Sequence, residues 1–130
     1  MRQSGKSEVS KLKREIQRLV REIVIRRDGG CVLNKIRHCE DSVLQADHLI
    51  TRANSATYDD TRLIVCLCRT CHGWKHWHER EYNALVKTIL DPKIVALWDQ
   101  CEKDSWRPTH RISADWSISI VALKQELATM

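Results

Sequence analysis

Most of the six cysteines and six histidines of this chain lie between residues 38 and 78, and this clustering constrains the fold more than any other feature. The cysteines are Cys31, Cys39, Cys66, Cys68, Cys71 and Cys101. The N-terminal segment MRQSGKSEVSKLKRE has no apolar stretch typical of a secretion signal, so we expect an intracellular, cytoplasmic protein. Because thiols stay reduced in that compartment, the cysteines are expected to be metal ligands or core residues rather than disulfides.

A length of 130 residues, with 42% hydrophobic and 30% charged residues, predicts a single domain spanning 1–130. No apolar run approaches the roughly 18 residues that a membrane-spanning helix requires, so we expect no membrane partner. The core that such a chain can build is modest. A structural metal ion would therefore help to stabilise its middle.

Hydrophobic periodicity predicts a small α+β protein. Residues 8–28 have apolar side chains at helical spacing, and the two glycines that follow are expected to end this helix. Val43–Ile50 and Arg62–Leu67 are the predicted strands, joined by the polar segment Thr51–Thr61. The remaining predictions are helices from about Arg69 through His76, over Tyr82–Leu90, over Lys93–Lys103 and over Asp115–Leu127, with an irregular segment at Trp106–His110.

Cys68 and Cys71 form a C-x-x-C pair, whose two thiolates can reach one tetrahedral zinc ion from a tight turn. A zinc site needs two further ligands, and Cys31 and Cys39 are the candidates. The seven residues between them exceed the usual spacing, which leaves two alternatives open. His38 could replace Cys39 as a ligand, or Cys31 and Cys39 could be ordinary small core residues.

The two remaining cysteines are expected to be structural. Cys66 precedes the C-x-x-C pair on a predicted strand, and we expect it to face away from Cys68 into the core. Cys101 lies in the predicted helix at 93–103, where a free cysteine behaves as a small hydrophobic residue.

Asp47, His48, His72 and His76 form a second group of polar residues, which lie close to the four cysteines in the sequence. His72 and His76 are four residues apart on a predicted helix, so both can approach one ion, and Asp47 offers a hard oxygen ligand. His48 is expected on the opposite side of its strand from Asp47, where its imidazole can turn toward a water. This combination suits metal-assisted hydrolysis of a phosphodiester. An oxygen-plus-imidazole site accepts Mg²⁺, Mn²⁺, Ni²⁺ or Zn²⁺.

At these residues the chain resembles a known family, the HNH endonucleases of the ββα-metal (His-Me finger) type, in the cysteine-containing version common in phages. The resemblance covers a little over a third of the chain. The residues that carry it are Cys31 and Cys39, Ala46-Asp47-His48-Leu49-Ile50, Arg52, and Leu67-Cys68-Arg69-Thr70-Cys71-His72. It implies a ββα-metal core at 31–80, flanked by the N-terminal helix and by a helical C-terminal extension at 81–130.

The resemblance also implies an enzyme, a DNA endonuclease acting in a bacterial or phage-infected cell. His48 matches the family's general base, which deprotonates the attacking water. Asp47 and His72 match the positions that hold one catalytic divalent ion, and His76 matches a further ligand that some members use. A structural zinc ion would lie beside this site, and cleavage would leave 5′-phosphate and 3′-hydroxyl ends.

The chain departs from the family pattern at one position. The motif's asparagine stands five residues before the first cysteine of C-x-x-C, where this chain has Leu63. Asn54 is close to His48 along the chain but could brace the loop. The departure leaves open an alternative, a zinc-stabilised nucleic-acid-binding module without catalytic activity.

A third interpretation is a purely structural zinc domain that docks to another protein through Trp98, Trp106 and Trp116. Neither this interpretation nor the second requires four histidine and carboxylate ligands in addition to four cysteines. Eight potential ligands indicate two different sites, which favours catalysis.

Basic residues indicate double-stranded DNA as the partner. Residues 1–27 contain nine Lys or Arg and three Glu, within a chain of net charge +5. The predicted phosphate contacts are Arg52, Arg62, Arg69 and Lys75 in the motif, and Lys13, Arg14 and Arg18 on the N-terminal helix. A solvated helix face is the alternative for that helix. Trp74 and Trp77 are expected to cover the core around the zinc.

Overall fold

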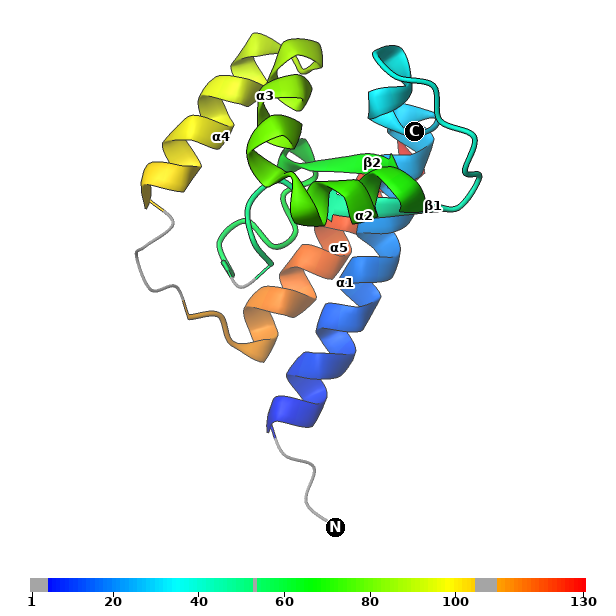
Figure 1. Ribbon diagram of the computed structural model, residues 1–130. Coiled ribbons are helices and arrows are strands. Elements are labelled where there is room, and N and C mark those ends of the chain that lie inside the picture. The colour runs from blue at the N-terminus through cyan, green and yellow to red at the C-terminus, as the bar shows by residue number, and fades with distance from the viewer. Residues whose placement is uncertain (1–4, 53, 105–109) are drawn as a thin grey trace.

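The computed structural model describes residues 5–52, 54–104 and 110–130, which form a small α+β protein. A two-stranded antiparallel sheet lies between two groups of helices (Figure 1). The elements in chain order are α1 (Gly5–Asp28), the 3₁₀ helix η1 (Val32–Lys35), β1 (Leu44–His48), the 3₁₀ helix η2 (Thr61–Leu63), β2 (Ile64–Cys68), α2 (Arg69–Trp77), α3 (Glu79–Ile89), α4 (Pro92–Asp104) and α5 (Ser113–Ala128).

The predicted elements are present, and the differences lie at their ends. β1 is shorter than predicted, since its pairing with β2 ends at His48, opposite Ile64. Leu49 and Ile50 follow the strand as buried residues. β2 begins later than predicted, since the side chain of Asp60 accepts a hydrogen bond from the Arg62 backbone N–H and starts a 3₁₀ turn there. The predicted irregular segment at Trp106–His110 lies outside the described residues except for its last residue.

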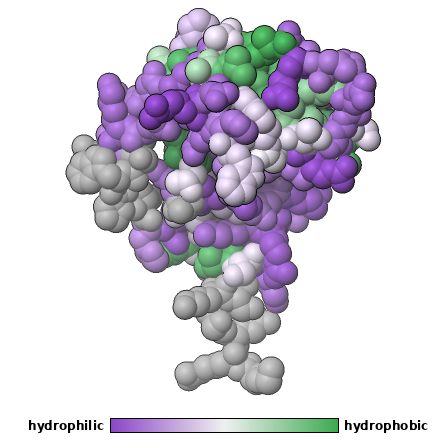
Figure 2. Space-filling model, in the orientation of Figure 1, coloured by the Kyte–Doolittle hydropathy of each residue, from purple (hydrophilic) through white to green (hydrophobic). Residues whose placement is uncertain are grey.

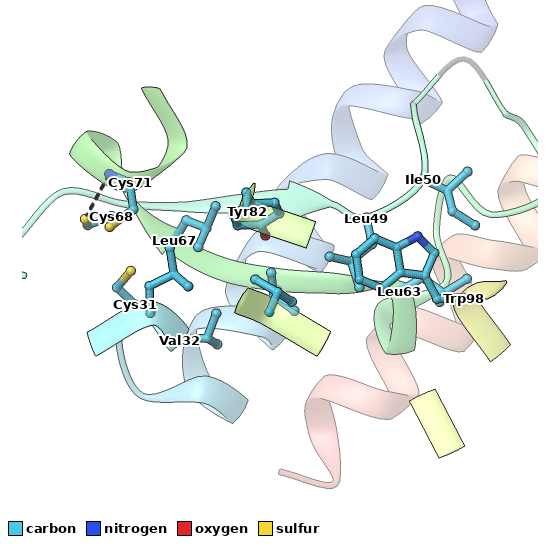
Figure 3. Packing of buried hydrophobic residues seen from close by; sticks show 13 residues of the cluster. Cys31, Val32, Leu49, Ile50, Leu63, Leu67, Cys68, Cys71, Tyr82 and Trp98 are labelled. Atoms are coloured by element: carbon cyan, nitrogen blue, oxygen red, sulfur yellow. Dashed lines mark hydrogen bonds between the residues drawn. The ribbon is translucent and has the colours of Figure 1, made fainter. Parts of the chain in front are cut away.

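The two faces of the sheet contribute to two hydrophobic clusters. The first cluster packs β2, η1, α3 and α4 together, with Trp98 and Tyr82 fully buried in it (Figure 3). The second cluster contains residues of α1 and α5 on the other face, and Trp116 is almost fully buried in it. β2 is buried along its whole length because Val65 and Leu67 point into the first cluster and Ile64 and Cys66 point into the second.

Hydrogen bonds fix the end of α1 against β2. Gly29 follows the helix with a φ of 70°, and its N–H donates to the carbonyl of Ile25 at 2.9 Å, an ending that favours glycine. The carboxylate of Asp28 accepts from the Cys66 N–H at 2.8 Å. The Arg27 guanidinium donates to the carbonyls of Thr61 and Ile64 at 2.6 Å each. Backbone groups that β1 leaves unpaired are thus satisfied by α1.

The surface seen in Figure 2 is mostly hydrophilic, in keeping with the charged outer faces of the helices. Among the helices of the described residues, none is long and apolar enough to cross a membrane.

Two tryptophans allow a matched test of the core. Trp98 is completely buried, whereas Trp77 is 81% exposed. We expect Trp98→Ala to lower the free energy of unfolding by about 3–5 kcal/mol, because the lost contacts leave a cavity. Trp77→Ala, the same substitution at the surface, should change it by no more than about 0.5 kcal/mol. Urea denaturation of both variants measures the difference, and equal losses would contradict the packing described here.

Candidate functional site

The four predicted zinc ligands converge at one end of the sheet. Cys31 precedes η1, Cys39 lies in the loop before β1, Cys68 ends β2 and Cys71 is in the first turn of α2. Their Sγ atoms all lie within 4.8 Å of one another. The Cys39 Sγ is 3.5 Å from the Cys71 Sγ and 3.8 Å from the Cys31 Sγ.

These distances fit a metal ion. Four sulfurs at about 2.3 Å from a tetrahedral zinc ion stand about 3.8 Å from one another. Within the described part of the chain, this is the one group of three or more His, Cys, Asp and Glu side chains arranged so that they could hold a metal ion. The cluster therefore confirms the predicted set of four cysteines as a site able to hold a structural ion such as zinc. His38 is exposed beside Glu40 and is not part of it.

Burial changes the pKa values of the clustered thiols, and a metal ion bound to them would contribute to folding. Burial raises the pKa of Cys39 to about 11 and raises the pKa of Cys71 further. Burial also raises the pKa of Cys68, but hydrogen bonds, including one from the Cys71 backbone N–H at 3.4 Å, outweigh it and lower that pKa. A bound cation would replace the thiol protons and hold four segments together.

Cys66 and Cys101 lie outside this cluster, as predicted. Cys66 is fully buried in the second hydrophobic cluster, while Cys68 belongs to the first. Strand alternation does not produce this separation, because residues two apart on a strand share a face. It arises because β2 ends at Cys68, which becomes the N-cap of α2 and turns toward the zinc ligands. Cys101 packs half-buried against the first cluster.

The two tryptophans of α2 differ. Trp74 is half-buried against the cluster that contains three of the zinc ligands, and its ring stacks on His78 at 5.1 Å and contacts the Arg37 guanidinium at 4.8 Å. The prediction that it covers this core is confirmed. Trp77 is 81% exposed, so the same prediction was wrong for Trp77. The α2 helix ends at this residue, where its side chain projects beyond the core.

The carboxylate of Asp47 is buried on β1, with 4% of the residue exposed. Lys75 donates to both of its oxygens, at 2.8 and 2.7 Å, and Tyr82 donates its hydroxyl at 2.8 Å. The Nε2 atom of His72 lies 3.4 Å from Oδ1. Burial raises the pKa of Asp47, but the bonds from His72 and Lys75 outweigh it and hold that pKa below its usual value.

His48 follows Asp47 and points to the opposite face of β1, as predicted. Its Nε2 lies 2.9 Å from the backbone carbonyl of Tyr58, and the two rings contact each other at 5.7 Å. Burial lowers the pKa of His48, outweighing the carbonyl, so the ring is neutral at neutral pH. A carbonyl only accepts, so Nε2 carries the ring proton and Nδ1 is left as the acceptor.

The structure places the two predicted histidines of α2 differently. The Nδ1 atom of His72 lies 2.6 Å from Oε1 of Gln45 on β1, which orients the ring toward Asp47. The carboxylate and imidazole are thus close enough to share one ion, as neighbouring ligands of a small divalent cation stand about 3 Å apart. His76 is exposed and contacts the ring of Trp77 at 5.3 Å, and it does not join this pair.

A hollow of about 230 Å³ brings the predicted catalytic residues to one surface. Its lining consists of Ala46, Asp47, His48, Thr51, Arg52 and His72. A second hollow of about 200 Å³ shares Ala46, His48 and Arg52 and extends to Gln17 and Arg21 of α1. The imidazole of His48 therefore lies between the Asp47–His72 pair and the N-terminal helix.

The loop between the strands shows what replaces the motif's asparagine. Leu63 is buried in the first hydrophobic cluster, and its backbone carbonyl accepts a hydrogen bond from the Leu49 N–H at 2.9 Å. The side chain of Asn54 accepts from the Ala56 N–H at 3.0 Å and so braces the loop. One backbone hydrogen bond and one side-chain hydrogen bond thus stabilise the chain between β1 and β2.

The predicted phosphate contacts occupy varied environments. Arg52 and Arg14 are exposed. Arg62 pairs with Asp60, Arg69 with Asp41, and Arg18 with Glu15, though all three arginines remain more than half exposed. Lys75 is different, because its side chain is 15% exposed and is bound to Asp47. Lys13 lies over the rings of Tyr58 and Trp116, at 5.3 and 5.0 Å.

Sequence reasoning missed three residues of this region, Tyr82, Gln45 and Tyr58. Each contacts a predicted site residue that lies at least ten positions away in the sequence, and no motif marks it. Two of the tryptophans offered for docking are buried, Trp98 completely and Trp116 to 1% exposure. They are core residues and do not form a docking surface. Trp106 lies outside the described residues.

Compared with known proteins, the chain matches no protein-family model, no curated protein and no solved structure. The functional assignment therefore depends on the residues and their geometry.

The cysteine cluster predicts one tightly bound zinc ion per chain. We expect Cys68→Ser to lose the zinc and to lower the melting temperature, because the ion contributes directly to folding. Cys101→Ser is the matched control and should keep both zinc and stability. Elemental analysis and thermal unfolding with and without a chelator measure the two properties. Zinc-free protein whose stability does not respond to chelation would contradict the site.

Proposed function

We propose that this protein is a metal-dependent DNA endonuclease of the HNH type, with a ββα-metal core formed by β1, β2 and α2. The observation that carries the proposal is the hollow lined by Asp47, His48, Arg52 and His72. Its lining includes a carboxylate, two imidazoles and an exposed guanidinium. These are the groups that metal-assisted phosphodiester hydrolysis requires.

The residues divide the reaction between them. The Nδ1 atom of His48 takes the proton of the attacking water, while the Tyr58 carbonyl at 2.9 Å holds the ring in position. Arg52 lies beside both hollows and is placed to bind the phosphate. Gln45 holds His72 toward Asp47. A divalent ion on these two residues would stabilise the charge that develops on the phosphate and the leaving oxygen.

A second candidate is a zinc-stabilised nucleic-acid-binding module without catalytic activity. Two observations favour it, Leu63 at the position of the motif's asparagine and Lys75 on both oxygens of Asp47. A plasmid-nicking assay of the zinc-loaded protein with Mg²⁺, Mn²⁺, Ni²⁺ and Zn²⁺ separates the two candidates. DNA binding without nicking in any of these ions would favour the second.

Removal of the general base tests the catalytic assignment directly. We expect His48→Ala to lower the nicking rate by roughly 100- to 10,000-fold, the usual contribution of a general base. DNA affinity and zinc content should stay near those of the unmodified protein. His38→Ala, which removes an exposed histidine paired only with Glu40, is the matched control and should nick normally. An unchanged rate in His48→Ala would refute the assignment.

The exposed arginines of α1 test the DNA-binding surface. Reversal of Arg14 and Arg18 to Glu should weaken binding to any DNA sequence and lower the slope of log affinity against log salt by about two units, one per phosphate contact. Lys13 is left unchanged because it packs on two rings. The control reverses Lys93 and Lys103 of α4. An unchanged slope in the α1 variant would mean that the helix only faces solvent.

A further inference from the structure

Lys75 was predicted to contact DNA, yet in the structure its side chain is mostly buried and pairs with Asp47. Its ammonium nitrogen lies 2.8 and 2.7 Å from the two oxygens of Asp47 and 3.2 Å from the backbone carbonyl of His48. It also lies over the ring of Tyr82 at 4.8 Å. One cation thus contacts three oxygens and an aromatic face, which is a site built for a positive charge.

The same oxygens are those that a divalent ion would need. Oδ1 of Asp47 already meets Lys75 and His72, and Oδ2 meets Lys75 and the Tyr82 hydroxyl. An ion bound between Asp47 and His72 would stand near the ammonium and repel it strongly at this low exposure. Both oxygens already accept hydrogen bonds in this geometry, so an ion bound to either of them would compete with the ammonium.

We propose that Lys75 and a divalent cation are mutually exclusive partners of Asp47, so that Lys75 holds the carboxylate in the metal-free protein and is released when the cation binds. Lys75 stabilises a buried charge that would otherwise be unpaired. The released side chain, four methylenes long, can then reach the DNA phosphate beside the hollow. This last step rests on the proposed function, whereas the exchange of cations does not require DNA.

Mn²⁺ binding to the zinc-loaded full-length protein tests the exchange. Zinc is loaded first because thiolates prefer it to the hard Mn²⁺ ion. In Lys75→Met, whose side chain keeps the apolar stem, electron paramagnetic resonance should show a Mn²⁺ dissociation constant about tenfold lower or more. The matched control is Lys87→Met, since Lys87 also pairs with an aspartate, Asp99 at 3.1 Å, and lies over a ring, Trp98 at 4.7 Å. It should leave the constant unchanged.

A measurement on the unmodified protein covers the case in which Lys75→Met does not fold. Acetylation of lysines, followed by peptide mass mapping, should modify Lys75 slowly without Mn²⁺ and several-fold faster with it. Lys87 should react at the same rate in both conditions. A Lys75 rate that Mn²⁺ does not change would overturn the exchange.

The outcomes separate this inference from the proposed function. Unchanged or weaker Mn²⁺ binding in Lys75→Met would overturn the exchange and leave the endonuclease proposal standing. Asp47→Asn should abolish Mn²⁺ binding both in the otherwise unmodified protein and in Lys75→Met. That result would show that the ion binds at this carboxylate. If neither protein binds Mn²⁺ through Asp47, the exchange fails, and so does the metal site of the proposed enzyme.

Discussion

A buried carboxylate determines how α2 and α3 lie on the sheet. Asp47 projects from β1 with 4% of its surface exposed, and an unpaired charge there would cost several kcal/mol. The partners that offset this cost come from two helices, Lys75 and His72 from α2 and Tyr82 from α3. A helix placed elsewhere would leave the charge unsatisfied. The hydrogen bonds to Asp47 and the packing of the first hydrophobic cluster therefore both require the same placement of α2 and α3 on the sheet.

His48 and Asp47 show how a two-residue pattern generates two environments. Because adjacent strand residues point to opposite faces, Asp47 meets α2 and α3 while His48 meets Tyr58 on the side of α1. Hydrogen-bond donors lower the pKa of Asp47 and favour its ionised form. Burial lowers the pKa of His48 and favours its neutral form. The proposed roles of Asp47 as a metal ligand and His48 as a general base need these opposite protonation states.

The parts of this arrangement that follow from local sequence were predictable, and the parts that follow from long-range contacts were not. C-x-x-C spacing indicated a shared ion, and the alternation of Asp47 and His48 indicated opposite faces. The contacts of Tyr82 and Tyr58 depend on how α3 and the inter-strand loop close over the sheet. The contact of Lys75 with Asp47 was missed for the same reason, since a lysine in a motif gives no sign that a buried carboxylate lies opposite it.

The position of Cys71 directly before His72 links the two halves of the site. Cys68 caps the N-terminus of α2, and Cys71 lies in its first turn, so the thiol cluster sets where the helix begins and how it is rotated. His72 takes its direction from that rotation. Chelation would act on the site in two stages. If the proposed cation binds at Asp47, a weak chelator would remove it alone, and adding the cation would reverse the loss. A strong chelator would also take an ion from the cysteine cluster and loosen the start of α2, so that recovery would require refilling that cluster first.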